Sequence, residues 1–292
     1  MSKANRIREQ SARERIAAQR AAARRAETRN RALLAGGSVL AVLVIVLVFV
    51  VIKLNSSSQG PPAAPRGTAL PASVTSQVTS VPASTLDAVG AGSALSYNPK
   101  AISPINGTPL TSGGKPEMLY MGAEYCPFCA TERWAMAVAL SRFGTFSPLH
   151  GIRSAPAPET FPDTATLTFY NTRYTSKYLT FTPVELQKVD HSPLQTPTSQ
   201  QNALLQQYTK GGIPFINFGG KYALTSVSYD PSVLQGLSWS QIAAALHKPS
   251  SPVAQGADGA ANLVTAAICK MTGNKPAGVC TSSTITSLQP RL

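Results

Sequence analysis

Two cysteines separated by two residues are the part of this sequence best suited to covalent chemistry. The string Cys126-Pro127-Phe128-Cys129 follows a short apolar run that breaks at Gly122, and it opens an amphipathic segment. This pattern predicts a strand, a tight turn and a helix that carries the dithiol at its N-terminus. Unpaired N–H groups and the positive end of the helix dipole stabilise a thiolate there. A stabilised thiolate is a populated nucleophile and a good leaving group, so the motif indicates dithiol–disulfide exchange.

A second informative string is Gly212-Ile213-Pro214-Phe215. It begins an apolar run that turns at Gly219-Gly220, a pair able to adopt the positive φ angles of a tight hairpin turn. A proline at the start of a strand cannot donate to the sheet. Such a proline is tolerated where the preceding peptide bond is cis and the bend has a use.

Taken together, these residues resemble the thioredoxin superfamily over roughly residues 115–250. The resemblance rests on a strand, the C-P-x-C string at a helix start and, some 85 residues later, the apolar–Pro start of a hairpin. It implies an α/β, thioredoxin-like three-layer fold with a central mixed sheet. It further implies that Cys126 is the exposed nucleophile, that Cys129 is the resolving thiol, and that a cis Pro214 lies beside them. Ile213 would pair with the substrate backbone, and Phe128 would offer the partner an apolar face.

The whole layout also resembles an uncharacterised family, domain of unknown function 929, whose members have one membrane anchor and a thioredoxin-like domain. One departure from thioredoxins concerns the proton acceptor for Cys129. Many thioredoxins carry a buried acid on the strand before the dithiol, and the matching position here is Tyr120. Glu124 is nearer but is expected to be exposed on the turn, so this acceptor stays unassigned. Because the motif contains no His or Lys, we expect an intermediate reduction potential.

The N-terminal region predicts a membrane anchor. Residues 1–31 form a basic arm with ten Lys or Arg and three Glu, and residues 33–52 contain no charge. Twenty mostly apolar residues at about 1.5 Å per residue cover a hydrocarbon core of roughly 30 Å, so residues 32–54 are expected to form one transmembrane helix of the signal-anchor type. The basic flank belongs in the cytoplasm, which puts everything after Lys53 outside the cell membrane.

Other interpretations of this region are weaker. A cleaved signal peptide with a cut within residues 56–64 stays open, although the apolar run is longer than such signals usually have. Arg24-Arg25 lacks the flanking residues of a twin-arginine signal. The arm contributes +7 of the chain's +13 charge. It is better explained by anionic lipid headgroups than by nucleic acid, so we expect no nucleic-acid partner.

The composition divides the remaining chain into three parts. Residues 55–100 are rich in Ser, Pro and Ala and are expected to be a flexible linker, with one short helix at residues 81–89. Residues 101–250 are expected to form the thioredoxin-like domain, and residues 251–292 a C-terminal helical extension that carries a cysteine pair. The expected strands cover residues 117–121, 149–154, two runs within 164–181, and the hairpin 213–226; the expected helices cover residues 126–143, 199–210, 238–247 and 262–271.

Cys269 and Cys280 form the second cysteine pair, with ten residues between them. Outside the cytoplasm such a pair is usually a structural disulfide. A shuttle pair that exchanges electrons with Cys126 and Cys129 is the alternative, because four cysteines allow three pairings. A zinc site would need two short knuckles, which this spacing does not provide, so no metal is expected.

These features predict a membrane-anchored, extracytoplasmic thiol–disulfide oxidoreductase that needs no cofactor. Its expected partners are the thiols or disulfides of exported proteins and a membrane or soluble redox partner that recharges the dithiol, together with the bilayer around residues 33–52. The sequence does not distinguish oxidase, reductase and isomerase roles. The alternative is a non-catalytic binding or scaffold domain of the same fold with static disulfides.

Overall fold

The computed structural model describes residues 67–292, which belong to one compact unit. The predicted basic arm, the predicted transmembrane helix and the first part of the predicted linker lie outside the described residues. Within residues 67–292, no helix combines the length and the apolar character that crossing a membrane requires.

A six-stranded mixed sheet forms the centre of the domain. Strand β4 (Lys115–Gly122) runs parallel to β9 (Thr180–Glu185) on one side and antiparallel to β10 (Phe215–Phe218) on the other. β10 turns back into β11 (Tyr222–Leu224), which pairs with β2 (Ile102–Pro104), while the short β3 (Thr111–Ser112) pairs with the start of β4. This confirms the predicted α/β class with a central mixed sheet.

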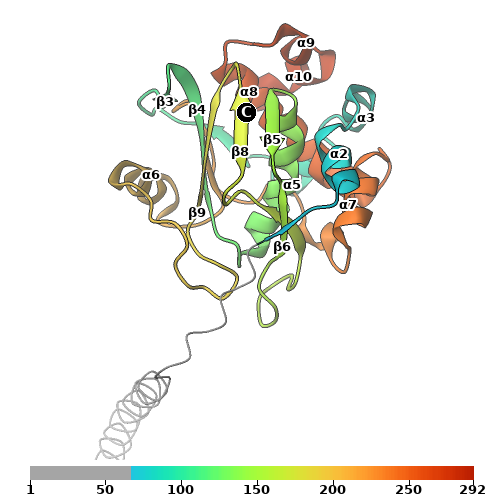
Figure 1. Ribbon diagram of the computed structural model, residues 1–292. Helices are drawn as coiled ribbons and strands as arrows, with labels where there is room; N and C mark the ends of the chain where they lie inside the picture. The colour runs from blue at the N-terminus through green and yellow to red at the C-terminus, as the bar shows by residue number, and fades with distance from the viewer. Residues whose placement is uncertain (1–66) are drawn as a thin grey trace, which may run out of the picture. The chain divides into compact units, whose positions relative to one another are not determined.

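Helices cover both faces of this sheet, because alternate residues of β4 point to opposite sides. Leu119 and Met121 pack with Leu205 of α6 (Ser199–Thr209). Met118 and Tyr120 belong to the larger core that includes α5 (Pro127–Ser141) and α8 (Gly259–Met271). Figure 1 shows α6 on one side of β4 and β9, with α5 and α8 on the other.

Between α5 and β9 the chain builds two further small sheets. β6 (His150–Arg153) pairs with β1 (Thr68–Ala69) and with β7 (Ala165–Thr168), and β5 (Gly144–Ser147) pairs with β8 (Arg173–Ser176). Two strands were expected within residues 164–181, but the structure has three strands that start there. The left-handed backbone of Asn171 lies between β7 and β8, whose partner strands belong to different sheets.

The described part of the expected flexible linker is ordered, and the short helix expected at residues 81–89 is one of three helices in it. Residues 72–97 form α2 (Ala72–Thr79), α3 (Ala83–Val89) and α4 (Ala94–Tyr97). Their few apolar side chains recur at helical spacing, so Val74, Val78 and Leu86 reach the core although the segment is mostly Ser, Thr and Ala. The Asn262 amide of α8 anchors α3 by donating to the Leu86 carbonyl at 2.8 Å.

The boundary expected at residue 250 is also wrong. After a 3-10 turn at Pro231–Leu234 come α7 (Trp239–Leu246), a π-helical turn at Ala254–Asp258, α8, α9 (Ala277–Cys280), α10 (Ser283–Leu288) and a final 3-10 turn at Gln289–Arg291. Helix α8 packs along α5 and its side chains share the main hydrophobic core. The C-terminal residues therefore complete the domain instead of extending it.

Candidate functional site

The two thiols of the C-P-x-C string lie at the start of α5, shortly after the end of β4. Cys126 is the N-cap residue of α5, and Pro127 occupies the first helical position, where its missing N–H costs nothing. The backbone N–H of Cys129 donates to Sγ of Cys126 at 3.2 Å. Both cysteines are free thiols, and Cys129 is fully buried.

The surroundings push the acidities of the two thiols apart. A hydrogen bond from the Cys129 side chain lowers the pKa of Cys126, and the backbone N–H groups of Cys129 and Phe128 and the charge of Arg133 act in the same direction, against burial. Burial raises the pKa of Cys129 well above its ordinary value, and its hydrogen bond to Cys126 adds to this. The pair thus consists of one sulfur prepared for ionisation and one that keeps its proton.

Cys126 is not the exposed residue that the resemblance implied, since only 5% of its surface is accessible. Cys126, Cys129 and Ala123 form a small apolar cluster, and Tyr125, Phe128 and Ile213 pack against it. The burial follows from the side chains around the motif, because short cysteine side chains at a helix start are easily covered by large neighbours.

Two loops extend this cover. In residues 155–164, the ring of Phe161 contacts the ring of Phe128. In the turn after β9, the ring of His191 lies against that of Tyr125, with 4.0 Å between the ring centres. The two loops approach each other through Glu159 and His191, whose Oε1 and Nε2 atoms are 4.0 Å apart. No local pattern in the sequence pointed to Phe161 or His191.

The second predicted string lies beside the dithiol. The Ile213–Pro214 peptide bond is cis, and β10 starts directly afterwards with Phe215 opposite Met121 of β4. The Ile213 side chain packs on the cluster that contains both sulfurs. The structure therefore brings Cys126, Cys129, Phe128 and Ile213 together, with Pro214 at the adjoining strand start; their roles in substrate binding stay predictions.

A buried ion pair lies behind the dithiol. Arg133, one turn further along α5 than Cys129, binds Glu185 of β9 through Nε–Oε1 (2.9 Å) and Nη2–Oε2 (2.6 Å). The expectation that Glu124 is exposed is wrong, since it is 8% accessible and its carboxylate accepts a hydrogen bond from Thr168. Burial raises the pKa of Glu124. The sequence did not indicate the Arg133–Glu185 ion pair, because 52 residues separate its two partners.

The predicted disulfide between Cys269 and Cys280 is present, with 5.5 Å between the two Cα atoms. It joins the end of α8 to α9. No group of three or more His, Cys, Asp or Glu side chains within residues 67–292 is arranged to bind a metal ion.

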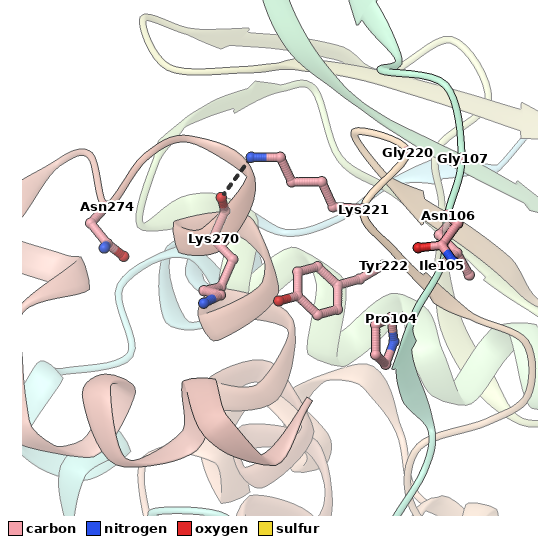
Figure 2. Close-up of a pocket in the computed structure, with 9 residues that line it drawn as sticks. All are labelled: Pro104, Ile105, Asn106, Gly107, Gly220, Lys221, Tyr222, Lys270 and Asn274. Atoms are coloured by element: carbon pink, nitrogen blue, oxygen red, sulfur yellow. Dashed lines mark hydrogen bonds between the residues drawn. The ribbon is translucent and has the colours of Figure 1, made fainter.

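A pocket of about 500 Å³ lies at the other end of the central sheet. Figure 2 shows its lining, with Lys270 and Asn274 on one side, Asn106 on the other, and Lys221 and Tyr222 between them. It adjoins the β10–β11 turn, which follows Phe218. Phe218 pairs with Met118, which lies in the half of β4 away from the dithiol. The pocket is therefore separate from the sulfur chemistry.

The fold and the site define an α/β domain that carries a closely spaced dithiol at a helix N-terminus. The family described as domain of unknown function DUF929 matches residues 101–270, which is more than half of the 292 residues, so the chain belongs to this family. No curated protein and no solved structure matches the sequence. The matched residues include the dithiol, the Arg133–Glu185 pair and the Ile213–Pro214 bond.

Proposed function

We propose that this protein is a thioredoxin-like thiol–disulfide oxidoreductase that acts through Cys126 and Cys129. The observation that carries the proposal is the position of Cys126 as the N-cap of α5, where its sulfur accepts the N–H of Cys129. A thiolate at such a terminus is stabilised without any cofactor. The partner thiol three residues later is within reach of the same sulfur, which is the requirement for resolving a mixed disulfide.

The order of the elements supports the finer assignment of the fold. Strand β4, helix α5 and the parallel strand β9 are followed by α6 and then by the antiparallel hairpin β10–β11. A thioredoxin-like domain is expected to place its dithiol after the first of these strands and its proline before the hairpin. Cys126 and Pro214 occupy those two positions in this chain.

The proposed exchange runs in two steps. The Cys126 thiolate attacks one sulfur of a partner disulfide, so that a mixed disulfide forms and the second partner sulfur leaves as a thiolate and takes a proton from solvent. Cys129 then attacks the Cys126 sulfur, its proton passes to the first partner sulfur, and that sulfur leaves as a thiol. The partner gains two electrons, and a Cys126–Cys129 disulfide results. The reverse sequence oxidises a partner dithiol, and a membrane or soluble redox partner sets the direction.

The proposed location is the outer side of the cell membrane, with residues 33–52 as a single-pass anchor and the basic arm in the cytoplasm. The uncharged run and the adjacent excess of Lys and Arg support the anchor and its orientation. The Cys269–Cys280 disulfide supports an oxidising compartment. In that compartment the substrates would be exported proteins.

One observation favours the alternative of a non-catalytic scaffold domain. With 5% of its surface accessible, Cys126 cannot meet a folded protein's disulfide unless its cover moves. In a scaffold the two cysteines would form a permanent bridge, and the cover would protect that bridge from reduction. The two functions therefore differ in whether Cys126 exchanges with an external disulfide.

The reduction of insulin disulfides by the full-length chain in detergent tests this difference. We expect turnover by the wild type and loss of that turnover in Cys126→Ser, with a Cys269→Ser/Cys280→Ser variant as the matched control that keeps the dithiol. Turnover that is unchanged in Cys126→Ser, or absent from the wild type, would support the scaffold instead.

A further inference from the structure

The Arg133–Glu185 pair is placed where it can act on the dithiol, although the exchange described above does not use it. Both side chains are completely buried, and two hydrogen bonds join them. Burying two charges has a large desolvation cost, and well-packed apolar side chains often replace such pairs without loss of stability. A buried pair beside two sulfurs therefore calls for an explanation other than stability.

The guanidinium reaches the dithiol through Ala123. Nη2 of Arg133 donates to the Ala123 carbonyl at 2.7 Å. Ala123 packs against both cysteines, and its own backbone N–H makes a hydrogen bond that lowers the pKa of Cys129. One residue, Ala123, thus connects the guanidinium to the inner sulfur, because its carbonyl accepts from Arg133 and the N–H of the preceding peptide unit faces Cys129.

The charge of Arg133 acts on both sulfurs directly. It lowers the pKa of Cys126 and also that of Cys129, where it opposes the effect of burial. The guanidinium therefore favours the anionic form of either sulfur. An opposite charge close to a titrating group commonly shifts its pKa by about one to three units.

Two unused donors lie in the same region. Among the described residues, neither Nη1 of Arg133 nor the hydroxyl of Tyr120 has a hydrogen-bond partner, although both are buried. Cζ of Arg133 is 5.9 Å from the centre of the Tyr120 ring, and both cysteines influence the pKa of Tyr120. Buried unpaired donors are costly, and a negative charge formed nearby would interact favourably with both.

This arrangement replaces the buried base that the resemblance implied at position 120. A carboxylate there would accept the proton of Cys129, whereas a phenol and a guanidinium stabilise the anion that remains. The other titratable groups around the dithiol are spread over several elements, namely Glu124 and Tyr125 on the turn, Glu159 in the loop 155–164, Glu185 on β9 and Lys188 beyond it. Of the groups near the sulfurs, Arg133 is the buried cation.

We propose that Arg133, held by Glu185, is a positioning residue that stabilises the anionic sulfur of the dithiol, so that Cys129 passes its proton to the departing partner sulfur without a carboxylate base at position 120. The catalytic meaning of this inference rests on the proposed function, but its physical content is the acidity of the thiols. Because stabilised thiolates favour the reduced form, the dithiol is also more oxidising than the Pro-Phe dipeptide alone predicts.

Opposite charge changes at the two ends of the ion pair test the inference. The ultraviolet absorbance of the thiolate, followed against pH in the full-length chain with the Cys269–Cys280 disulfide intact, reports the pKa of Cys126. We expect Arg133→Met to raise this pKa by about one unit. We expect Glu185→Gln, which leaves the guanidinium charge uncompensated, to lower it, and Arg133→Lys to restore most of the wild-type value. The equilibrium constant for thiol–disulfide exchange with glutathione should shift towards the Cys126–Cys129 disulfide in Arg133→Met. The expected shift is about tenfold for each unit by which the thiol pKa rises.

A purely structural role predicts a different pattern. Loosened packing would move the pKa in the same direction in Arg133→Met and Glu185→Gln, or in neither, and either result overturns the inference. If Arg133→Met does not fold, Glu185→Gln and Arg133→Lys still give the required signs. If the protein reduces insulin but the pKa of Cys126 does not change in these variants, the inference alone is refuted. If the pKa of Cys126 changes as expected but the protein does not reduce insulin, the proposed function alone is refuted.

Discussion

The ring of Phe161 meets the ring of Phe128 edge-on, with 6.1 Å between the ring centres. Phe161 holds a left-handed backbone conformation, with φ of 55°, which is unusual for a bulky residue. Its carbonyl accepts a hydrogen bond from the Thr164 hydroxyl at 2.9 Å, which helps to hold the loop in place. This contact joins the loop 155–164 to the middle of the dithiol motif, and we interpret it as part of the cover over Cys126.

Removing this ring should therefore expose the sulfur. We expect Phe161→Ala to increase the rate at which iodoacetamide alkylates Cys126 by roughly threefold or more, because local opening controls access to buried groups. Tyr97→Ala is the matched control, since Tyr97 is 45% exposed and belongs to α4. Equal alkylation rates in both variants and the wild type would show that Phe161 does not limit access.

Asp258 should make the stability of the domain depend on pH. Both of its carboxylate oxygens are buried and, among the described residues, have no hydrogen-bond partner, and burial raises its pKa to about 8. Since this folded-state pKa lies above the unfolded value of about 4, the neutral carboxyl is favoured at low pH, and stability is lost as the pH rises towards 8. At about 1.4 kcal/mol per pKa unit, the loss between pH 5 and pH 8 is about 2–4 kcal/mol.

Urea unfolding of wild type and Asp258→Asn at these two pH values measures the effect. In Asp258→Asn, the free energy of unfolding should fall much less between pH 5 and pH 8 than in the wild type. Glu132, whose buried carboxyl has a pKa of about 7, should account for the smaller fall that remains. The same decrease in both proteins would mean that Asp258 is already ionised in the folded state.

The Cys269–Cys280 disulfide is expected to stabilise the domain without taking part in exchange. It closes a loop with a sequence separation of 11 residues. Constraint of the unfolded chain by a loop of this size gives about 3 kcal/mol. The Cys269→Ala/Cys280→Ala variant should lose about that free energy of unfolding, while its Cys126–Cys129 reduction potential stays at the wild-type value. A changed potential would favour the shuttle role instead.

The membrane anchor can be tested by fractionation of cells that produce the tagged chain. We expect the full-length chain in the membrane fraction, resistant to extraction by high salt because apolar contacts with lipid are not screened by ions. A variant with Leu43→Lys and Val46→Lys should lose this association, since a charge near the bilayer centre costs about 2.5–3.5 kcal/mol per residue. Release of the wild type by salt alone would indicate surface binding through the basic arm.

The sequence predicted those parts of the fold that depend on local patterns. Short strings of residues that favour one local structure predict three elements. These are the strand before the dithiol, the helix that starts after Cys126, and the hairpin with its Gly219-Gly220 turn. Of the helices over residues 72–97, the one expected at residues 81–89 is present as α3, whereas α2 and α4 were missed because Ser, Thr and Ala dominate the composition of this segment. Their packing partners, such as Asn262 of α8 beside α3, lie far away in the sequence.

The candidate site shows the same division. The cysteines and Ile213 could be found from motifs, whereas the ion pair of Arg133 and Glu185 depends on the parallel pairing of β4 with β9. Phe161 reaches the dithiol from a loop without regular structure. These contacts decide how acidic and how accessible Cys126 is, and only the assembled fold brings them together.

The formation of a mixed disulfide tests the central claim most directly. A Cys129→Ser variant of the full-length chain, incubated with a protein disulfide substrate such as insulin and analysed by mass spectrometry, should accumulate an adduct linked through Cys126. The adduct should be absent from Cys126→Ser. A Cys129→Ser protein that is correctly folded yet forms no adduct at Cys126 would contradict the account.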